Sequence, residues 1–240
     1  MNEIRYNRSI MDDRELNRLV DSLRDMYFLE ECDEAVLQRL ARACRLRHLP
    51  KGSMVFFQSD PGEALYLVLS GSVSILLTSS DGRELVINEV RAGDFCGELS
   101  IITRQPHSAS AITREKSDLI MIPAVPFLEL LDCQPKAVRR LLESTAQRLY
   151  ASSSRESALA FLDAAGRVVR ILLQLDQEND EKGYMILSQE ELAQRTGLAR
   201  QTVAKILGRW RRAGWLLTGR GRIMLMNRSA LQKVAEQSNL

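Results

Sequence analysis

The residues with the clearest chemical potential lie between Arg200 and Arg212, near the end of the chain. Apolar side chains recur in this segment at helical spacing, which places them on one face of a helix: Val203, Ile206, Leu207 and Trp210. Long polar or basic side chains take the opposite face or the N-terminal end: Arg200, Gln201, Lys205 and Arg212. A helix that is buried on one side and basic on the other suits the major groove of DNA. We therefore expect this segment to bind double-stranded DNA.

Two neighbouring segments extend this constellation. Ser188-Gln189-Glu190-Glu191 fits a capping box in which Ser188 caps a short helix and Glu191 occupies its third position, and Gly197 supplies the turn between the two helices. Thr218-Gly219-Arg220-Gly221-Arg222 predicts the tip of a β-hairpin wing with two arginines. The predicted DNA-binding residues are Ser188, Gln189, Arg200, Gln201, Thr202, Lys205, Arg209, Arg212, Arg220 and Arg222.

The charge distribution supports a nucleic-acid partner. The chain has a formal net charge of +2, but residues 184–240 contain ten Lys/Arg and three Asp/Glu, so their net charge of +7 opposes −5 on residues 1–183. A basic C-terminal quarter on an otherwise acidic chain is typical of proteins that bind nucleic acid. The alternative is a winged-helix module that binds another protein, and so strong a positive charge disfavours it.

The cysteine spacing and the motifs exclude several classes of protein. The four cysteines match no zinc or iron–sulfur pattern, so we expect reduced thiols. Two histidines are too few for a multi-histidine metal site. The sequence contains no P-loop, no Gly-x-Ser-x-Gly and no His-Glu-x-x-His motif. We therefore predict no metal, no catalytic residues and no enzymatic activity.

The sequence also argues against a membrane protein. It contains no apolar run that could span a bilayer, and its first residues lack the apolar segment of a secretory signal. We therefore expect a cytoplasmic protein with no membrane partner.

The segment from Leu49 to Ile122 predicts a scaffold of strands. Short strand-like stretches alternate there with Gly-containing turns: Met54–Phe57, Ala64–Leu69, Ser72–Thr78, Arg83–Val90 and Ser108–Thr113. This pattern is typical of an antiparallel barrel or jelly roll. A helix over Asp33–Arg45, with Asp33 as its N-cap, is predicted before the strands. Residues 1–26 are charged and predict a helical arm.

A long helix is predicted from Lys136 to Leu162, after Pro135 in its first turn. One narrow stripe follows a spacing near 3.5 residues: Val138, Leu141 or Leu142, Thr145, Leu149, Ser152, Glu156 and Leu159. The stripe favours a dimer interface, and the alternative is a helix packed on its own domain. Asp163 is predicted to cap a further helix, and residues 184–187 predict a short strand.

Three stretches of the chain resemble the cyclic-AMP receptor protein family (CRP/FNR) of bacterial transcription regulators, over about residues 27–228. Gly97-Glu98-Leu99-Ser100 is similar to the family's phosphate-binding cassette. Residues 160–167 are similar to its hinge, and Ser188 to Leu207 is similar to its helix-turn-helix. The resemblance implies a homodimer with a sensor β-roll, in which a small effector controls DNA binding.

The resemblance also assigns roles on the second DNA-binding helix. It implies that Arg200, Gln201 and Lys205 read bases. Arginine pairs with guanine, and Gln201, which stands where the family has a glutamate, prefers adenine to cytosine, so we expect a different operator. Ala199 stands where the family has a serine, and the loss of that helix cap costs about 1 kcal/mol.

For the effector, the resemblance implies a site formed by Gly97, Glu98, Leu99, Ser100, His107, Ser108, Ser152 and Ser153. Glu98 and the backbone around it would hold a ribose and a phosphate, and the two serines on the long helix would contact the base. His107 stands where the family has an arginine and is mostly uncharged near neutrality, with Arg104 nearby in sequence to compensate. Three alternatives stay open: cyclic AMP, another nucleotide-like effector, or no effector.

The sequence therefore predicts an α+β protein with four parts. These are an N-terminal arm (1–26), an antiparallel β-roll sensor domain of the jelly-roll, cyclic-nucleotide-binding type (27–135), a dimerisation helix and hinge (136–163), and a winged helix-turn-helix domain (164–240). We predict a homodimeric transcription regulator that binds a pseudo-palindromic operator and RNA polymerase. The alternatives are an effector-independent regulator of the same family and a regulatory subunit of a partner enzyme, which the helix-turn-helix disfavours.

Overall fold

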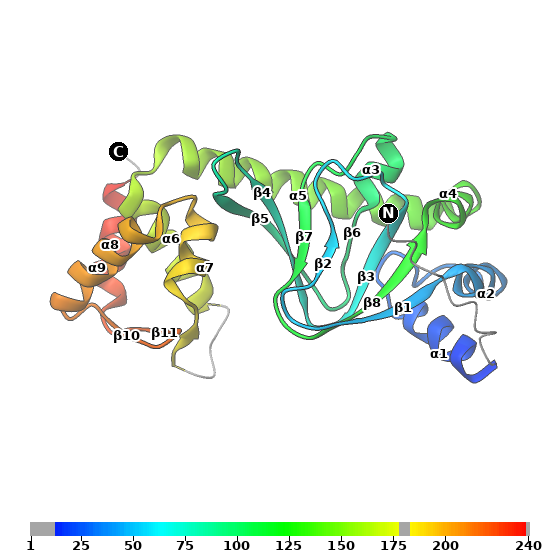
Figure 1. Ribbon diagram of the computed structural model, residues 1–240, viewed down its shortest axis with the longest axis horizontal. Coiled ribbons are helices and arrows are strands. Elements are labelled where there is room, and N and C mark those ends of the chain that lie inside the picture. Colours follow the sequence, from blue (N-terminus) through cyan, green and yellow to red (C-terminus); the bar gives the residue numbers. More distant parts are fainter. Residues whose placement is uncertain (1–12, 178–182, 239–240) are drawn as a thin grey trace. The chain divides into compact units, whose positions relative to one another are not determined.

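The computed structural model describes residues 13–177 and 183–238. The chain divides into two compact units, which we call the roll unit (residues 1–75 and 89–146) and the winged-helix unit (residues 76–88 and 147–240). The first contains most of the strands and the second most of the later helices (Figure 1).

Two antiparallel sheets form the roll, with strand orders β1-β8-β3-β6 and β2-β7-β4-β5 (Figure 1). Their strands are β1 (Arg45–Leu49), β2 (Met54–Phe56), β3 (Ala64–Ser70), β4 (Ser72–Thr78), β5 (Glu84–Arg91), β6 (Phe95–Cys96), β7 (Ser110–Thr113) and β8 (Ser117–Pro123). The pairs β1–β8, β3–β8, β3–β6 and β2–β7 are antiparallel. This arrangement confirms the predicted α+β fold with an antiparallel β-roll.

The start of the roll differs from the prediction. The helix expected over Asp33–Arg45 ends earlier, as α2 (Glu34–Ala43), and Arg45 begins β1, where it pairs with Met121 of β8. Asp33 occupies the N-cap position, but its side chain accepts a hydrogen bond from Gln134 Nε2 at 3.0 Å instead of capping the helix. The strand β8, together with β6, α3 (Glu98–Thr103) and α4 (Ala124–Cys133), has no counterpart among the predicted elements.

The described part of the expected N-terminal arm belongs to the roll unit. Helix α1 (Asp13–Arg24) buries Leu19, Val20 and Leu23 in the same apolar cluster as Leu37 of α2 and Phe127 of α4. Burial of each large side chain contributes about 1.5–3 kcal/mol. Residues 13–26 are therefore part of a core, and residues 1–12 lie outside the described chain.

Strand β3 separates two apolar clusters of the roll unit. Its alternate side chains Leu65 and Leu67 join the cluster made with α1, α2 and α4, whereas Tyr66 and Val68 join a second cluster formed by strand residues. This alternation follows from the two-residue period of a strand. The second cluster includes Phe56, against which the candidate effector site is built.

The long helix is observed as α5 (Pro135–Phe161), within one residue of the predicted bounds at each end. It is followed by α6 (Ala164–Gln177), whose first turn is capped as predicted, because Gly166 N donates to Asp163 Oδ1 at 2.7 Å. Among the residues of α5, only Ala137 and Leu141 are buried. The described chain therefore leaves most of this long helix uncovered.

The described residues of the winged-helix unit share an apolar core. Helices α7 (Gln189–Thr196) and α8 (Arg200–Arg212) pack with α6 and α9 (Arg228–Gln237), beside a sheet of order β10-β11-β9. Its strands are β9 (Met185–Ile186), β10 (Leu216–Gly219) and β11 (Arg222–Leu225). The predicted buried face of α8 is confirmed, since its four apolar residues all lie in this core.

The wing is a tighter hairpin than the sequence predicts. Gly219 pairs with Arg222, so only Arg220 and Gly221 form the turn, and Arg222 is the first residue of β11 rather than a tip residue. Helix α9 has no counterpart among the predicted elements. Its first residue, Arg228, forms an ion pair with Asp176 of α6, with Nε–Oδ2 at 2.5 Å. The C-terminal helix therefore closes the core on the side of α6.

Candidate DNA-binding surface and effector site

Local features of the chain define the start and the end of α7. Ser188 Oγ accepts a hydrogen bond from Glu191 N at 3.1 Å, and Ser188 N donates to Glu191 Oε2 at 2.8 Å, which confirms the predicted capping box. Helix α7 ends at Gly197, whose φ of +65° is a left-handed conformation that favours glycine. The chain then passes through Leu198 and Ala199 into α8, which begins at Arg200.

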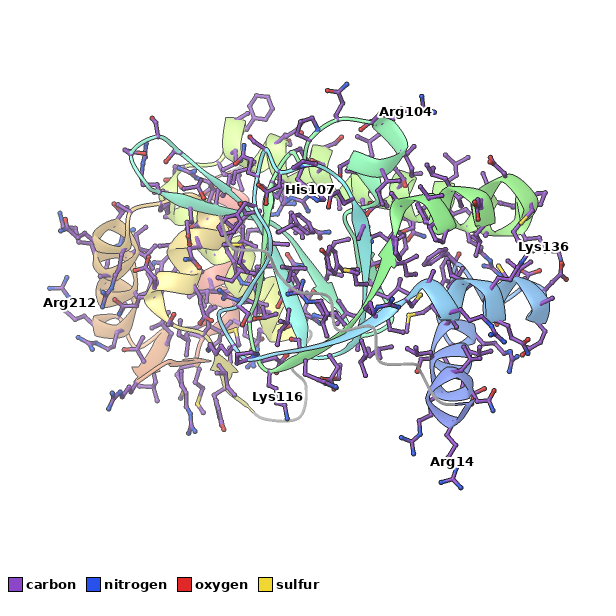
Figure 2. The ribbon with its side chains drawn as sticks, turned by 45° about the vertical axis from the view of Figure 1, so that its right-hand side comes forward. Arg14, Arg104, His107, Lys116, Lys136 and Arg212 are labelled. Atoms are coloured by element: carbon purple, nitrogen blue, oxygen red, sulfur yellow. The ribbon has the colours of Figure 1, made fainter. Side chains whose placement is uncertain are left out.

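The predicted base-reading residues lie on the exposed face of α8. Arg200, Gln201 and Lys205 are exposed, and Thr202 is half-buried. Figure 2 shows Arg212 projecting from the last turn of the helix into solvent. The basic residues of that last turn, Arg209, Arg211 and Arg212, also interact favourably with the C-terminal end of the helix dipole. At the other end of α8, Ala199 takes the N-cap position without a side-chain cap, as the sequence predicts.

A hollow of about 370 Å³ brings together residues from α7, α8 and the wing. Its lining includes Ser188, Gln189, Glu190, Arg200, Thr218 and Arg222. Four of these six were predicted DNA-binding residues. Glu190 was not, although the sequence places it in the first turn of the predicted helix, next to Glu191 of the capping box.

Two side chains in this region have contacts that the sequence does not predict. Arg200 Nε lies 3.9 Å from Glu190 Oε2, and both side chains are exposed. The Arg222 guanidinium lies over the Tyr184 ring, 4.7 Å from its centroid, in a cation–π contact. Arg220, in the turn of the wing, is exposed.

The candidate effector cassette begins at a glycine that the backbone requires. Gly97 has a φ of +92°, and a Cβ atom there would lie 3.0 Å from the carbonyl oxygen of Ala64. The next residue, Glu98, is buried, with 2% of its surface exposed. Ser100 is also buried and donates from Oγ to the carbonyl oxygen of Gly97 at 2.9 Å. The cassette is therefore a tightly packed turn that leads into α3.

His107 is built into this turn. Its Nδ1 lies 2.8 Å from Ser100 Oγ, and its ring stacks on Phe56 with centroids 3.8 Å apart. The backbone nitrogen of His107 also donates to the carbonyl oxygen of Asp60 at 2.9 Å. Burial lowers the pKa of the imidazole below its ordinary value, although the nearby Asp60 carboxylate acts in the opposite direction. His107 is therefore neutral near pH 7.

The other predicted effector residues are more exposed. Figure 2 shows His107 among the strands of the roll and Arg104 at the outer end of α3, and Leu99, Arg104 and Ser108 are exposed. Ser152 and Ser153 belong to the winged-helix unit. Their hydroxyl groups donate within α5, from Ser152 to Glu156 Oε1 and from Ser153 to the carbonyl oxygen of Leu149, each at 3.3 Å.

The described residues contain no cluster of His, Cys, Asp or Glu that could hold a metal ion. The four cysteines are free, and burial raises the pKa of Cys44 to about 12 and that of Cys32 to about 11. These two thiols are therefore protonated near neutral pH. Within the same residues, no helix combines the length and apolar character needed to cross a membrane.

Comparisons with known proteins match both units. Residues 46–133 match the family profile of the cyclic nucleotide-binding domain, and residues 166–234 match that of the Crp-like helix-turn-helix domain. The chain is 31% identical, over 170 residues, to the cAMP-activated global transcriptional regulator CRP of Salmonella typhimurium, covering 68% of this chain and 81% of that protein. It is 34% identical, over 173 residues, to the CRP-like cAMP-activated global transcriptional regulator of Mycobacterium tuberculosis, covering 70% and 77%.

Among solved structures, the chain is similar to the c-di-GMP-responsive global regulator CLP of Xanthomonas campestris. The two share 27% sequence identity with a TM-score of 0.74, over 80% of this chain and 99% of that one. The architecture therefore agrees with the sequence relationship.

The burial of His107 makes the stability of the roll depend on pH. Its pKa is lowered in the folded protein, and the unfolded chain has the ordinary value of about 6.5. The unfolded chain therefore takes up a proton more readily, and we expect the free energy of unfolding to decrease as the pH falls below about 6.5. Urea denaturation at pH 7.5 and pH 5.5 measures this change.

His107→Gln is the matched variant, since glutamine does not titrate and all other groups are unchanged. We expect the variant to lose less stability than the wild type over the same pH interval. Equal losses in the two proteins would show that His107 has no such role.

Proposed function

The chain belongs to the CRP/FNR family of transcription regulators, and from this premise we propose that it binds a pseudo-palindromic DNA operator as a homodimer. It combines a cyclic nucleotide-binding domain with a DNA-binding helix-turn-helix domain, and it is a regulator rather than an enzyme. We also propose that it acts in the cytoplasm and contacts RNA polymerase.

The observation that carries the proposal is the division of α8 into two faces. Val203, Leu207 and Trp210 are buried in the core of the winged-helix unit, so the exposed Gln201 and Lys205 point away from it. In this proposal α8 enters the major groove, and its N-terminal residues contact base edges. Each subunit would read one half-site, with the half-sites about one turn of DNA apart.

We expect Arg200 and Arg222 to make different kinds of contact with DNA, the first with a base and the second with a phosphate. Arg200→Ala should weaken operator binding by about 1–3 kcal/mol and relax specificity at one base pair, because a bidentate guanine contact is lost. Arg222→Ala should weaken binding to all DNA sequences by a similar factor and reduce the salt slope by about one, because a phosphate contact is lost. Fluorescence anisotropy at several salt concentrations, on DNA selected from a random pool, measures both effects.

Lys233→Ala is the control, since Lys233 is an exposed cation on α9 of the same unit. It should change neither quantity. Unchanged specificity in Arg200→Ala would contradict the assignment of α8 as the recognition helix.

The homodimer is supported by the exposed apolar side chains of α5. This helix has 27 residues and is about 40 Å long at 1.5 Å per residue. Leu142 and Leu149 are 67% and 68% exposed, and Val138 and Leu159 are also exposed. Several large apolar side chains on one stripe of a helix indicate an interaction surface, and the spacing near 3.5 residues is that of a helix pair. We propose a second copy of α5 as the partner.

Leu149→Glu should separate the subunits, because two like charges would meet across the symmetry axis in an apolar interface. We expect a monomer in sedimentation velocity and a large loss of operator affinity. Ala151→Glu is the control, since residue 151 is also exposed but lies about 200° around the helix from residue 149. If Leu149→Glu stays dimeric, α5 is not the interface.

We further propose a cyclic nucleotide as the effector. The relatives from Salmonella and Mycobacterium are described as cAMP-activated and the one from Xanthomonas as c-di-GMP-responsive, so the class of ligand is shared while its identity varies. Gly97 and Glu98 match the cassette of the family. His107 replaces the family's arginine, and a neutral imidazole offers a phosphate one hydrogen bond but no charge. The contact of Ser152 and Ser153 with the base stays a prediction from the sequence resemblance.

For cyclic AMP we therefore expect weak binding near neutral pH that tightens as the pH falls toward 6. A bound anion raises the pKa of His107, so binding takes up a proton and is favoured by acid. His107→Arg should bind more tightly and lose most of this pH dependence, since arginine stays charged. Calorimetry on both proteins at pH 6 and pH 7.5 measures the difference. Tight, pH-independent binding by the wild type would contradict the role of His107.

A further inference from the structure

The carboxylate of Glu190 lies on the predicted DNA-binding face, where a negative charge would be expected to repel phosphate. Glu190 and Arg200 line the same hollow as Ser188, Gln189 and Arg222. Arg200 Nε is 3.9 Å from Glu190 Oε2, and 69% and 59% of the two side chains are exposed. An ion pair with this exposure adds little to the stability of a fold. Its location therefore suggests a role at the surface.

The position of Arg200 in α8 favours a negative charge nearby. Arg200 is the first residue of the helix, and its N-cap residue, Ala199, provides no side-chain hydrogen bond. The positive end of the helix dipole is an unfavourable place for a guanidinium. Glu190, in the first turn of α7, supplies an opposite charge there and favours an orientation of the Arg200 side chain toward α7.

The side from which Glu190 approaches the Arg200 guanidinium determines which of its nitrogens can contact a base. A guanidinium can contact a base through its two terminal nitrogens, Nη1 and Nη2, or through Nε and one terminal nitrogen. The carboxylate approaches Nε, so this ion pair leaves the terminal nitrogens Nη1 and Nη2 available as a fork. That fork matches the O6 and N7 atoms of guanine.

We propose that Glu190 is a positioning residue that orients the Arg200 guanidinium for end-on, bidentate reading of a guanine. This inference rests on the proposed function, in which Arg200 reads a base. Glu190 then has opposite effects on the two kinds of binding. It strengthens discrimination at one guanine through Arg200, and it weakens contact with any DNA through its charge near the phosphates.

Glu190→Gln in the full-length protein tests this proposal. The probes are a duplex selected from a random pool by the wild-type protein, the same duplex with each G·C pair of one half-site changed in turn to A·T, and a scrambled duplex of equal length and composition. A bidentate arginine–guanine contact discriminates by about 5- to 150-fold. We expect Glu190→Gln to reduce the discrimination at one guanine by about 3- to 10-fold, with equal or tighter binding to the scrambled duplex.

Three further variants separate positioning from other roles. Glu190→Asp keeps the charge but shortens the side chain, so it should lose discrimination without any gain on the scrambled duplex. In an Arg200→Ala background, Glu190→Gln should have no effect on discrimination. Glu236→Gln, an exposed carboxylate on α9, should change nothing. Each variant keeps the Ser188–Glu191 capping box, so we expect the helix-turn-helix to stay folded. Thermal unfolding of each variant checks this.

The outcomes distinguish this proposal from the one on which it rests. A uniform rise in affinity for all probes would mean that Glu190 only repels phosphate, and would overturn the positioning role. The same is true if Glu190→Gln leaves discrimination unchanged, or alters it equally in the Arg200→Ala background. If the wild type itself discriminates at no guanine, then base reading by Arg200 is wrong and the positioning role is wrong with it.

Discussion

Burial of one face of α8 is the constraint on which the winged-helix unit depends. Val203 and Leu207 are almost completely enclosed, and Trp210 is among the largest fully buried side chains of the described chain. Each such side chain contributes about 1.5–3 kcal/mol when it leaves water. Because successive residues of a helix are separated by about 100°, burying this face directs the side chains of Gln201 and Lys205 toward solvent. A rotation of the helix would bury charges without partners, which is far more costly.

The same core sets the direction of the wing. In β11, Ile223 and Leu225 are buried while Arg222 is exposed, as the two-residue period of a strand requires. The Tyr184 ring then holds the Arg222 guanidinium in a cation–π contact, and the turn leaves Arg220 exposed. Apolar packing thus determines where the charged groups of the wing lie.

In the roll unit, a comparable constraint acts on polar groups. Ser100 and His107 are buried, and their side chains contact each other. Ser100 Oγ also donates to the carbonyl oxygen of Gly97, and the backbone nitrogen of His107 donates to the carbonyl oxygen of Asp60. Buried polar groups need such partners because an unsatisfied one costs about 1–3 kcal/mol. Stacking on Phe56 completes the enclosure of the imidazole. The fold therefore encloses His107 by burial, by the contact with Ser100 and by stacking on Phe56.

The sequence by itself determined the features that depend on neighbours in the chain. The two faces of α8, the capping box at Ser188, the turn at Gly197 and the bounds of α5 all follow from spacing over a few residues or turns. The basic charge of the C-terminal quarter is likewise a property of composition. These local signals were sufficient for the helix-turn-helix, for the alternation of strands and turns, and for the family resemblance that the comparisons confirm.

Only the tertiary structure decided the features that join distant residues. The strand β1 exists because Arg45 to Leu49 pair with β8, more than sixty residues later, and α1 is part of a core because α2 and α4 cover it. The burial of His107, the stacking of Arg222 on Tyr184 and the approach of Glu190 to Arg200 are also contacts between separate elements. Periodicity and charge describe each segment alone, whereas these contacts depend on which segments pack together, and packing is determined by the whole chain.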